Sequence, residues 1–227
     1  MARLLYVRNS VAFVLGAVRR HMRLSRKATG GETFYAAIAP SRDALTFKKE
    51  QYEKAAEITE DAADDIVLAK GELGNCIRDV FDACKKFERG SGNGSILNRV
   101  FPDGTFSEMV NSTHQKIHKE AKDMVTRILS LGSRHEINPF ALLLNEKIAA
   151  LDAVIATHTA SEQIEQTASA EMEIAKANLV KLYEDNYLDA RRKLGRVAAE
   201  KIFPALTNKP KPKNDGDTPP KPNGGDK

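Results

Sequence analysis

The chain lacks tryptophan altogether, and of its 227 residues only two are cysteine and only 6% are aromatic. With 41% hydrophobic and 29% charged residues, this composition suits helices with solvated outer faces better than a β-sandwich or barrel. Cys76 and Cys84 lie eight positions apart in one predicted helix, too far to bridge at a rise of ~1.5 Å per residue. The sequence therefore excludes a disulfide framework and favours a reducing compartment, so we expect an intracellular, cytoplasmic protein.

Known catalytic and cofactor motifs are also lacking. The glycine-rich stretch 88–95 lacks the Gly-Lys-Ser/Thr ending of a phosphate-binding loop and is predicted to be a flexible tip. No histidine follows a glutamate at the three-residue spacing that a di-iron bundle needs, and the acidic run 60–65 is typical of a solvated helix face. We predict that the protein is not an enzyme and binds no cofactor.

One weak metal candidate is the pair His114 and His118, four residues apart on a predicted helix, where both imidazoles could share a metal ion. A real site needs further ligands. Asn111, Ala121 and Lys122 occupy the next positions on that face, so the sequence predicts a solvated or interface pair rather than a metal centre.

Acidic residues are missing from the first 31 positions, which carry seven basic residues. Residues 32–206 have a net charge of −5, and residues 207–227 have a net charge of +2 with many Pro, Gly and Lys residues. The sequence thus predicts a basic arm (1–31), a helical body (32–206) and a disordered tail (207–227).

The arm is predicted to be an amphipathic helix that is too short and too charged to span a membrane. It also matches the pattern of a secretory signal peptide poorly. Three interpretations stay open: it lies on an anionic membrane, it is a mitochondrial presequence, or it packs its apolar stripe on the body. The candidate membrane- or partner-binding residues are Leu4, Val7, Val11, Val14, Val18, Arg8, Arg19, Arg20, Arg23 and Arg26.

Long segments without helix breakers dominate the body. After a predicted turn at Pro40 and Ser41, a helix is expected over 43–89, and Thr105 with Glu108 fits a capping box opening another helix to about residue 131. Asn138 before a proline is a good N-cap, and residues 140–194 contain neither Gly nor Pro. One continuous helix is favoured there over a hairpin folded at the polar stretch 157–169.

Apolar residues along this last segment follow a coiled-coil spacing, with His158 in step as a polar position. The candidate seam residues are Leu144, Ile148, Leu151, Ile155, His158, Met172, Leu179 and Leu182. Long seams whose polar middle cannot bury itself commonly find a second chain, so we expect a homo-oligomer or larger assembly.

Together these observations predict an all-α fold: an elongated antiparallel bundle or coiled coil of three to four long helices, with a flexible basic arm and a disordered tail. The predicted function is that of a structural or protein-interaction scaffold. Two alternatives are a peripheral membrane protein anchored through residues 4–24 and a protein that contacts nucleic acid electrostatically, without sequence preference.

Overall fold

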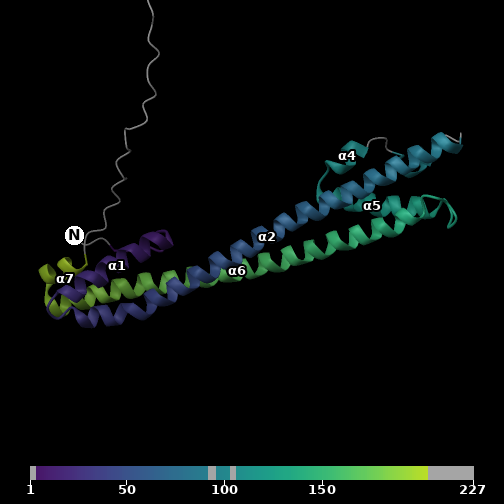
Figure 1. The fold of residues 1–227 in the computed structure, drawn as a ribbon. Helices are drawn as coiled ribbons and strands as arrows, with labels where there is room; N and C mark the ends of the chain where they lie inside the picture. The colour runs from purple at the N-terminus through teal and green to yellow at the C-terminus, as the bar shows by residue number, and fades with distance from the viewer. Residues whose placement is uncertain (1–3, 92–95, 103–105, 204–227) are drawn as a thin grey trace, which may run out of the picture. The chain divides into compact units, whose positions relative to one another are not determined.

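The computed structural model describes residues 4–91, 96–102 and 106–203, and this part of the chain is all-α. Two long helices, α2 (Glu32–Ser91) and α6 (Pro139–Leu194), pack antiparallel (Figure 1). The shorter helices are α1 (Val11–Lys27), α3 (Ile96–Val100), α4 (Phe106–Val110), α5 (His114–Leu129) and α7 (Arg196–Ile202). The all-α antiparallel fold predicted from the sequence is confirmed.

The chain divides into two compact units. A terminal unit comprises Met1–Leu45 and Ala175–Lys227, and a central unit comprises Thr46–Ile174. Both long helices contribute to each unit, since α2 begins in the terminal unit and α6 ends there.

The central unit has a mainly aliphatic core, formed by α2, α3, α5 and the first half of α6, with phenylalanines at its edge. Its fully buried side chains recur at helical spacing, which shows why these segments pack as amphipathic helices. They include Leu73, Ile77, Val80, Val100, Ile117, Met124, Ile128, Leu144 and Leu151. Cys76 and Cys84 are buried free thiols in this core, and burial raises the pKa of the Cys84 thiol to about 11.

The terminal unit has a more aromatic core, which surrounds α1. Ser10 caps the start of helix α1, and its hydroxyl accepts a hydrogen bond from the Phe13 amide at 3.3 Å. Its apolar side packs with the start of α2, the end of α6 and α7. The buried side chains of this unit include Val14, Val18, His21, Phe34, Ile38, Leu179, Tyr183, Tyr187 and Phe203.

Two glycines join α1 to α2. Gly30 has a φ of 74°, a left-handed conformation that favours glycine, and a Cβ at Gly31 would overlap the Ser25 carbonyl oxygen. The hinge predicted between the arm and the body is therefore a tight connection, and the apolar side of α1 is buried within the terminal unit rather than carried on a mobile arm.

The turn predicted at Pro40 and Ser41 is wrong, because α2 begins at Glu32 and continues through Pro40. Proline removes one amide donor from the helix ladder, but Pro40 and Ala36 are both exposed, so the Ala36 carbonyl can bond to water instead. At the other end, α2 runs to Ser91, so the flexible tip predicted over 88–95 is helical at its start, and residues 92–95 lie outside the described residues.

A single helix to about residue 131 is also wrong. Helix α4 ends at Val110, and α5 begins after Thr113, whose hydroxyl accepts a hydrogen bond from the Lys116 amide at 3.4 Å. This second cap starts a new helix. The predicted capping residue Thr105 lies outside the described residues, as does the predicted disordered tail 207–227.

The continuous helix predicted across the polar stretch 157–169 is confirmed, because α6 runs unbroken for 56 residues from Pro139. It ends where Gly195 adopts a φ of 81°, and the short helix α7 that follows was not predicted. Within the described ranges, no helix combines the length and apolar character needed to cross a bilayer.

Candidate functional site

The predicted seam residues of α6 divide between the cores of the two units. In the central unit, Leu144 and Leu151 are fully buried, Ile148 and Met172 are nearly so, and Ile155 is half-buried. In the terminal unit, Leu179 is fully buried and Leu182 is half-buried. These residues thus lie on the buried side of α6.

Small side chains form the α2–α6 contact in the polar stretch of the central unit. Ala55, Ala62 and Ser161 are buried there with exposed fractions of 5–6%. The Ser161 hydroxyl donates to the His158 carbonyl at 2.8 Å, and the half-buried His158 ring lies 3.8 Å from the Glu162 carboxylate. Because these contact residues are small, the stretch buries little apolar area, and the helix pair has an open hollow on either flank.

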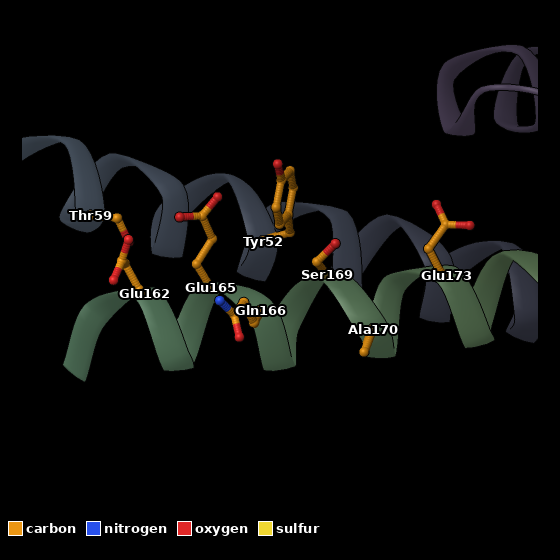
Figure 2. A pocket seen from close by; sticks show the side chains of 8 residues that line it. All are labelled: Tyr52, Thr59, Glu162, Glu165, Gln166, Ser169, Ala170 and Glu173. Atoms are coloured by element: carbon orange, nitrogen blue, oxygen red, sulfur yellow. The ribbon is translucent and has the colours of Figure 1, made fainter. Parts of the chain in front are cut away.

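The first hollow, here called the glutamate flank, has a volume of about 470 Å³. In Figure 2 the side chains of Glu165, Ser169 and Glu173 point to the same side as Tyr52 of α2. Three carboxylates within three helical turns make this flank strongly acidic. Its lining residues are Tyr52, Thr59, Glu162, Glu165, Gln166, Ser169, Ala170 and Glu173.

The second hollow, here called the isoleucine flank, has a volume of about 670 Å³ and a more apolar lining. Ile58 of α2 is 56% exposed and Ile164 of α6 is 60% exposed. Along α6 its residues share the spacing of the glutamate flank but are offset by two positions, which places them on the opposite side of the α2 contact. The lining comprises Gln51, Lys54, Ala55, Ile58, Ala160, Gln163, Ile164, Thr167, Ala168 and Glu171.

Charges on the isoleucine flank are balanced. Lys54 and Glu171 are its two ionisable lining residues, one of each sign. The Glu171 carboxylate also accepts a hydrogen bond from Lys48 Nζ at 2.6 Å, and Lys48 donates to the Gln51 side-chain oxygen at 2.9 Å. This network holds the polar end of the flank, while Ile58 and Ile164 occupy the apolar part.

The arm residues take different places within the terminal unit. On the apolar side, Val14 and Val18 are fully buried and Leu4 and Val11 are half-buried, whereas Val7 is exposed. Three of the arginines, Arg19, Arg23 and Arg26, line one cleft with residues of α2. Arg20 is exposed outside that lining, and Arg8 lies over the Tyr6 ring at 5.1 Å.

Sequence reasoning missed His21, which is fully buried in the terminal unit. Its Nδ1 lies 2.9 Å from the Ile202 carbonyl oxygen, its Nε2 lies 3.4 Å from Asn186 Nδ2, and its ring stacks on Phe203 at 3.9 Å between centroids. Burial lowers the pKa of His21, although contacts with the Ile202 and Phe34 carbonyls partly oppose this. The ring is therefore a neutral donor and acceptor in the core.

The signal for His21 was present in the spacing Val14, Val18, His21 and Ser25, all of which are buried on one side of α1. These intervals of four, three and four residues match the apolar stripe of the same helix. A polar residue in step with such a stripe is a candidate for a buried network.

The two candidate metal ligands are not joined by further ligands. His118 Nε2 lies 2.7 Å from Asp152 of α6, and the Lys122 ammonium lies 3.8 Å from the same carboxylate. Among the described residues there is no group of three or more His, Cys, Asp or Glu side chains arranged to hold a metal ion. The Asp152 carboxylate of α6 thus contacts two side chains of α5, His118 and Lys122.

Comparisons of the chain with protein-family models, with curated proteins and with solved structures find no match.

Proposed function

We propose that the protein is a non-enzymatic structural protein that assembles with a second copy of itself through the isoleucine flank. The observation that carries the proposal is the pair Ile58 and Ile164, both more than half exposed beside small residues in an open hollow. Isolated exposed apolar residues are ordinary, but two that share a hollow with several alanines offer a surface for helix packing.

Charge favours a second copy on this flank rather than on the other. One Lys and one Glu line the isoleucine flank, so two such flanks can meet without net repulsion. Two glutamate flanks would bring six carboxylates together, since each has Glu162, Glu165 and Glu173. Like charges at close range oppose that second contact.

An isologous contact, with the two-fold axis near Ile58 and Ile164, fits the arrangement of the flank. The apolar residues lie toward one end and the Lys48–Glu171 network lies toward the other. Only pairing about the apolar end sets isoleucine against isoleucine, whereas a shifted head-to-tail contact would set isoleucine against charge. The result is a four-helix contact made by two α2–α6 pairs.

The affinity should be modest. Ten lining residues per copy are fewer than the ~20–30 on each side of a standard interface, so we expect a dissociation constant of roughly micromolar to millimolar. Sedimentation velocity of the full chain across that concentration range should show a reversible monomer–dimer equilibrium.

The matched test compares Ile164→Glu with Gln166→Glu. Both residues are exposed on α6 and both changes add one negative charge, but only the first lies on the isoleucine flank. We expect Ile164→Glu to weaken dimerisation at least ~10-fold and Gln166→Glu to leave it nearly unchanged. A wild-type chain that stays monomeric throughout, or equal effects of the two changes, would contradict the proposal.

The membrane alternative has less support. It requires the apolar side of the arm to face lipid, and Val14, Val18 and Met22 of that side are buried in the terminal unit. Helix α1 would have to leave its packing before those residues could insert.

A further inference from the structure

A basic cleft lies within the terminal unit, between α1 and the first turns of α2. Its volume is about 330 Å³, and buried Met22 contributes to its lining. On α1, residues 19, 22, 23 and 26 follow the i, i+3, i+4, i+7 spacing of one helix side. Tyr35 and Arg42, seven residues apart, do the same on α2.

The lining of the cleft is rich in cationic side chains. Of its seven described lining residues, five are cationic and none is acidic, the five being Arg19, Arg23, Arg26, Lys27 and Arg42. Like charges brought to one cavity repel each other, and an anion inside relieves that repulsion. The positions of Arg26 and Lys27 in the last turn of α1 are explained by the helix dipole, but the dipole does not explain Arg19 and Arg23.

Two of the arginines are held in place. The Arg26 guanidinium stacks over the Tyr35 ring at 4.1 Å and donates a hydrogen bond to the Tyr35 hydroxyl. Arg42 is partly buried, and its Nε lies 3.1 Å from the Asp43 carboxylate, which is outside the lining. Side chains ordered in this way lose less conformational entropy when they bind a ligand.

From this geometry we infer that the basic cleft binds a ligand with clustered phosphate groups. Guanidinium groups donate paired hydrogen bonds that match phosphate oxygens. Arg42 is paired with Asp43, and the other four cations of the lining require several negative charges to balance them. One carboxylate would neutralise only one of these four. The volume lies at the low end of small-molecule sites, ~300–1,000 Å³, and suits a compact polyphosphate or a phosphorylated headgroup.

The probe is inorganic tripolyphosphate, titrated calorimetrically into the full chain at fixed, moderate salt. The cleft variant is Arg19→Gln with Arg23→Gln, and the matched control is Arg191→Gln with Arg192→Gln on α6. All four arginines are exposed, so both variants should fold, and each loses two charges. Thermal melting of both variants checks their folding.

We expect saturable one-to-one binding that weakens at least ~10-fold in the cleft variant and no more than about threefold in the control. Replacing Arg19 and Arg23 by Lys should give an intermediate affinity, since the charge stays and the paired donors are lost. Equal losses in the cleft variant and the control, or no saturable binding, would overturn the inference.

A second arm separates two sources of the same chemistry. Vesicles containing a phosphatidylinositol bisphosphate are sedimented with the full chain, beside vesicles of equal charge made with phosphatidylserine. If the chain sediments only with the phosphatidylinositol bisphosphate vesicles, the phosphate groups that the cleft binds belong to a lipid headgroup. Tripolyphosphate binding without retention assigns them to a soluble ligand.

Discussion

The two units of this chain differ in both their charge and their cores. The terminal unit has 20 basic and 9 acidic residues, and the central unit has 15 basic and 22 acidic residues. The central core is mainly aliphatic, whereas the terminal core includes a buried histidine with aromatic and amide neighbours. The central unit is thus stabilised mainly by close packing of buried apolar side chains, and the terminal unit also depends on specific hydrogen bonds.

This difference underlies the two activities that we propose for the chain. Along α2 and α6 the sequence of the central unit leaves exposed isoleucines, which suits packing against another helix pair. In the terminal unit the first turns of α2, with α1, bring arginines together. Salt should separate the two proposed activities, because screening weakens phosphate binding and leaves apolar association unchanged or stronger.

The largest expected effect comes from truncating a side chain in the core of the central unit. Leu144→Ala removes a fully buried side chain of the central core and should lower the free energy of unfolding by ~2–5 kcal/mol. Leu143→Ala is the control, since Leu143 is 46% exposed. Chemical denaturation measures both, and a similar small cost for the two variants would show that the central core does not depend on close packing at Leu144.

A smaller loss of stability is expected when the polar network of the terminal unit is broken. Asn186 donates to the Phe34 carbonyl at 2.8 Å and lies beside His21, so Asn186→Ala leaves buried polar groups without their partner. The free energy of unfolding should fall by ~1–3 kcal/mol. The control, Asn178→Ala at an exposed position on the same helix, should leave it almost unchanged. Hydrogen exchange should locate the loss in α1 and α7, and faster exchange confined to α5 would contradict this assignment.

Acid should weaken the terminal unit through His21. Its pKa in the folded protein is lowered from 6.5, so the unfolded chain binds the proton more readily. The stabilisation by neutral His21 is complete above the unfolded pKa and is lost as the pH falls below about 6.5. Hydrogen exchange of α1 amides, corrected for intrinsic rates, should show lower protection at about pH 5 than at about pH 7.5.

A His21→Gln variant provides the control for this pH effect. It removes the titrating ring, so the extra loss of protection in acid should vanish from α1 even if overall stability is lower. If α1 in the wild type is equally protected at both pH values, the neutral state of His21 does not contribute to the stability of the terminal unit.

The sequence predicted these features unequally. Pro139, the absence of breakers and the apolar stripe correctly predicted the extent of α6, because local propensity and tertiary packing agree there. The predicted cap itself is wrong, since the Asn138 side-chain oxygen has no hydrogen-bond partner among the described residues. Pro40 misled the prediction because an exposed helix side tolerates a missing amide donor. The basic cleft could not be predicted, since it forms only when the turn at Gly30 and Gly31 sets α1 beside α2.

The smallest expected effect is a gain in stability rather than a loss. Burial raises the pKa of Tyr183, and no hydrogen-bond partner for its hydroxyl is found among the described residues. Tyr183→Phe keeps the ring packed against His21 and Phe203 and removes the buried hydroxyl, so it should raise the free energy of unfolding by up to ~1 kcal/mol. A loss above ~1 kcal/mol in denaturation would show that the hydroxyl has a partner in solution.

Site-directed disulfide crosslinking tests the central claim, self-assembly through the isoleucine flank, most directly. Ile164→Cys and Gln166→Cys place a thiol on opposite flanks of the same stretch of α6, while Cys76 and Cys84 stay buried in the core. Near an isologous axis, residue 164 meets its own copy, so mild oxidation should give a covalent dimer of Ile164→Cys at concentrations where Gln166→Cys stays monomeric. Equal crosslinking of the two variants, or none in either, would contradict the account.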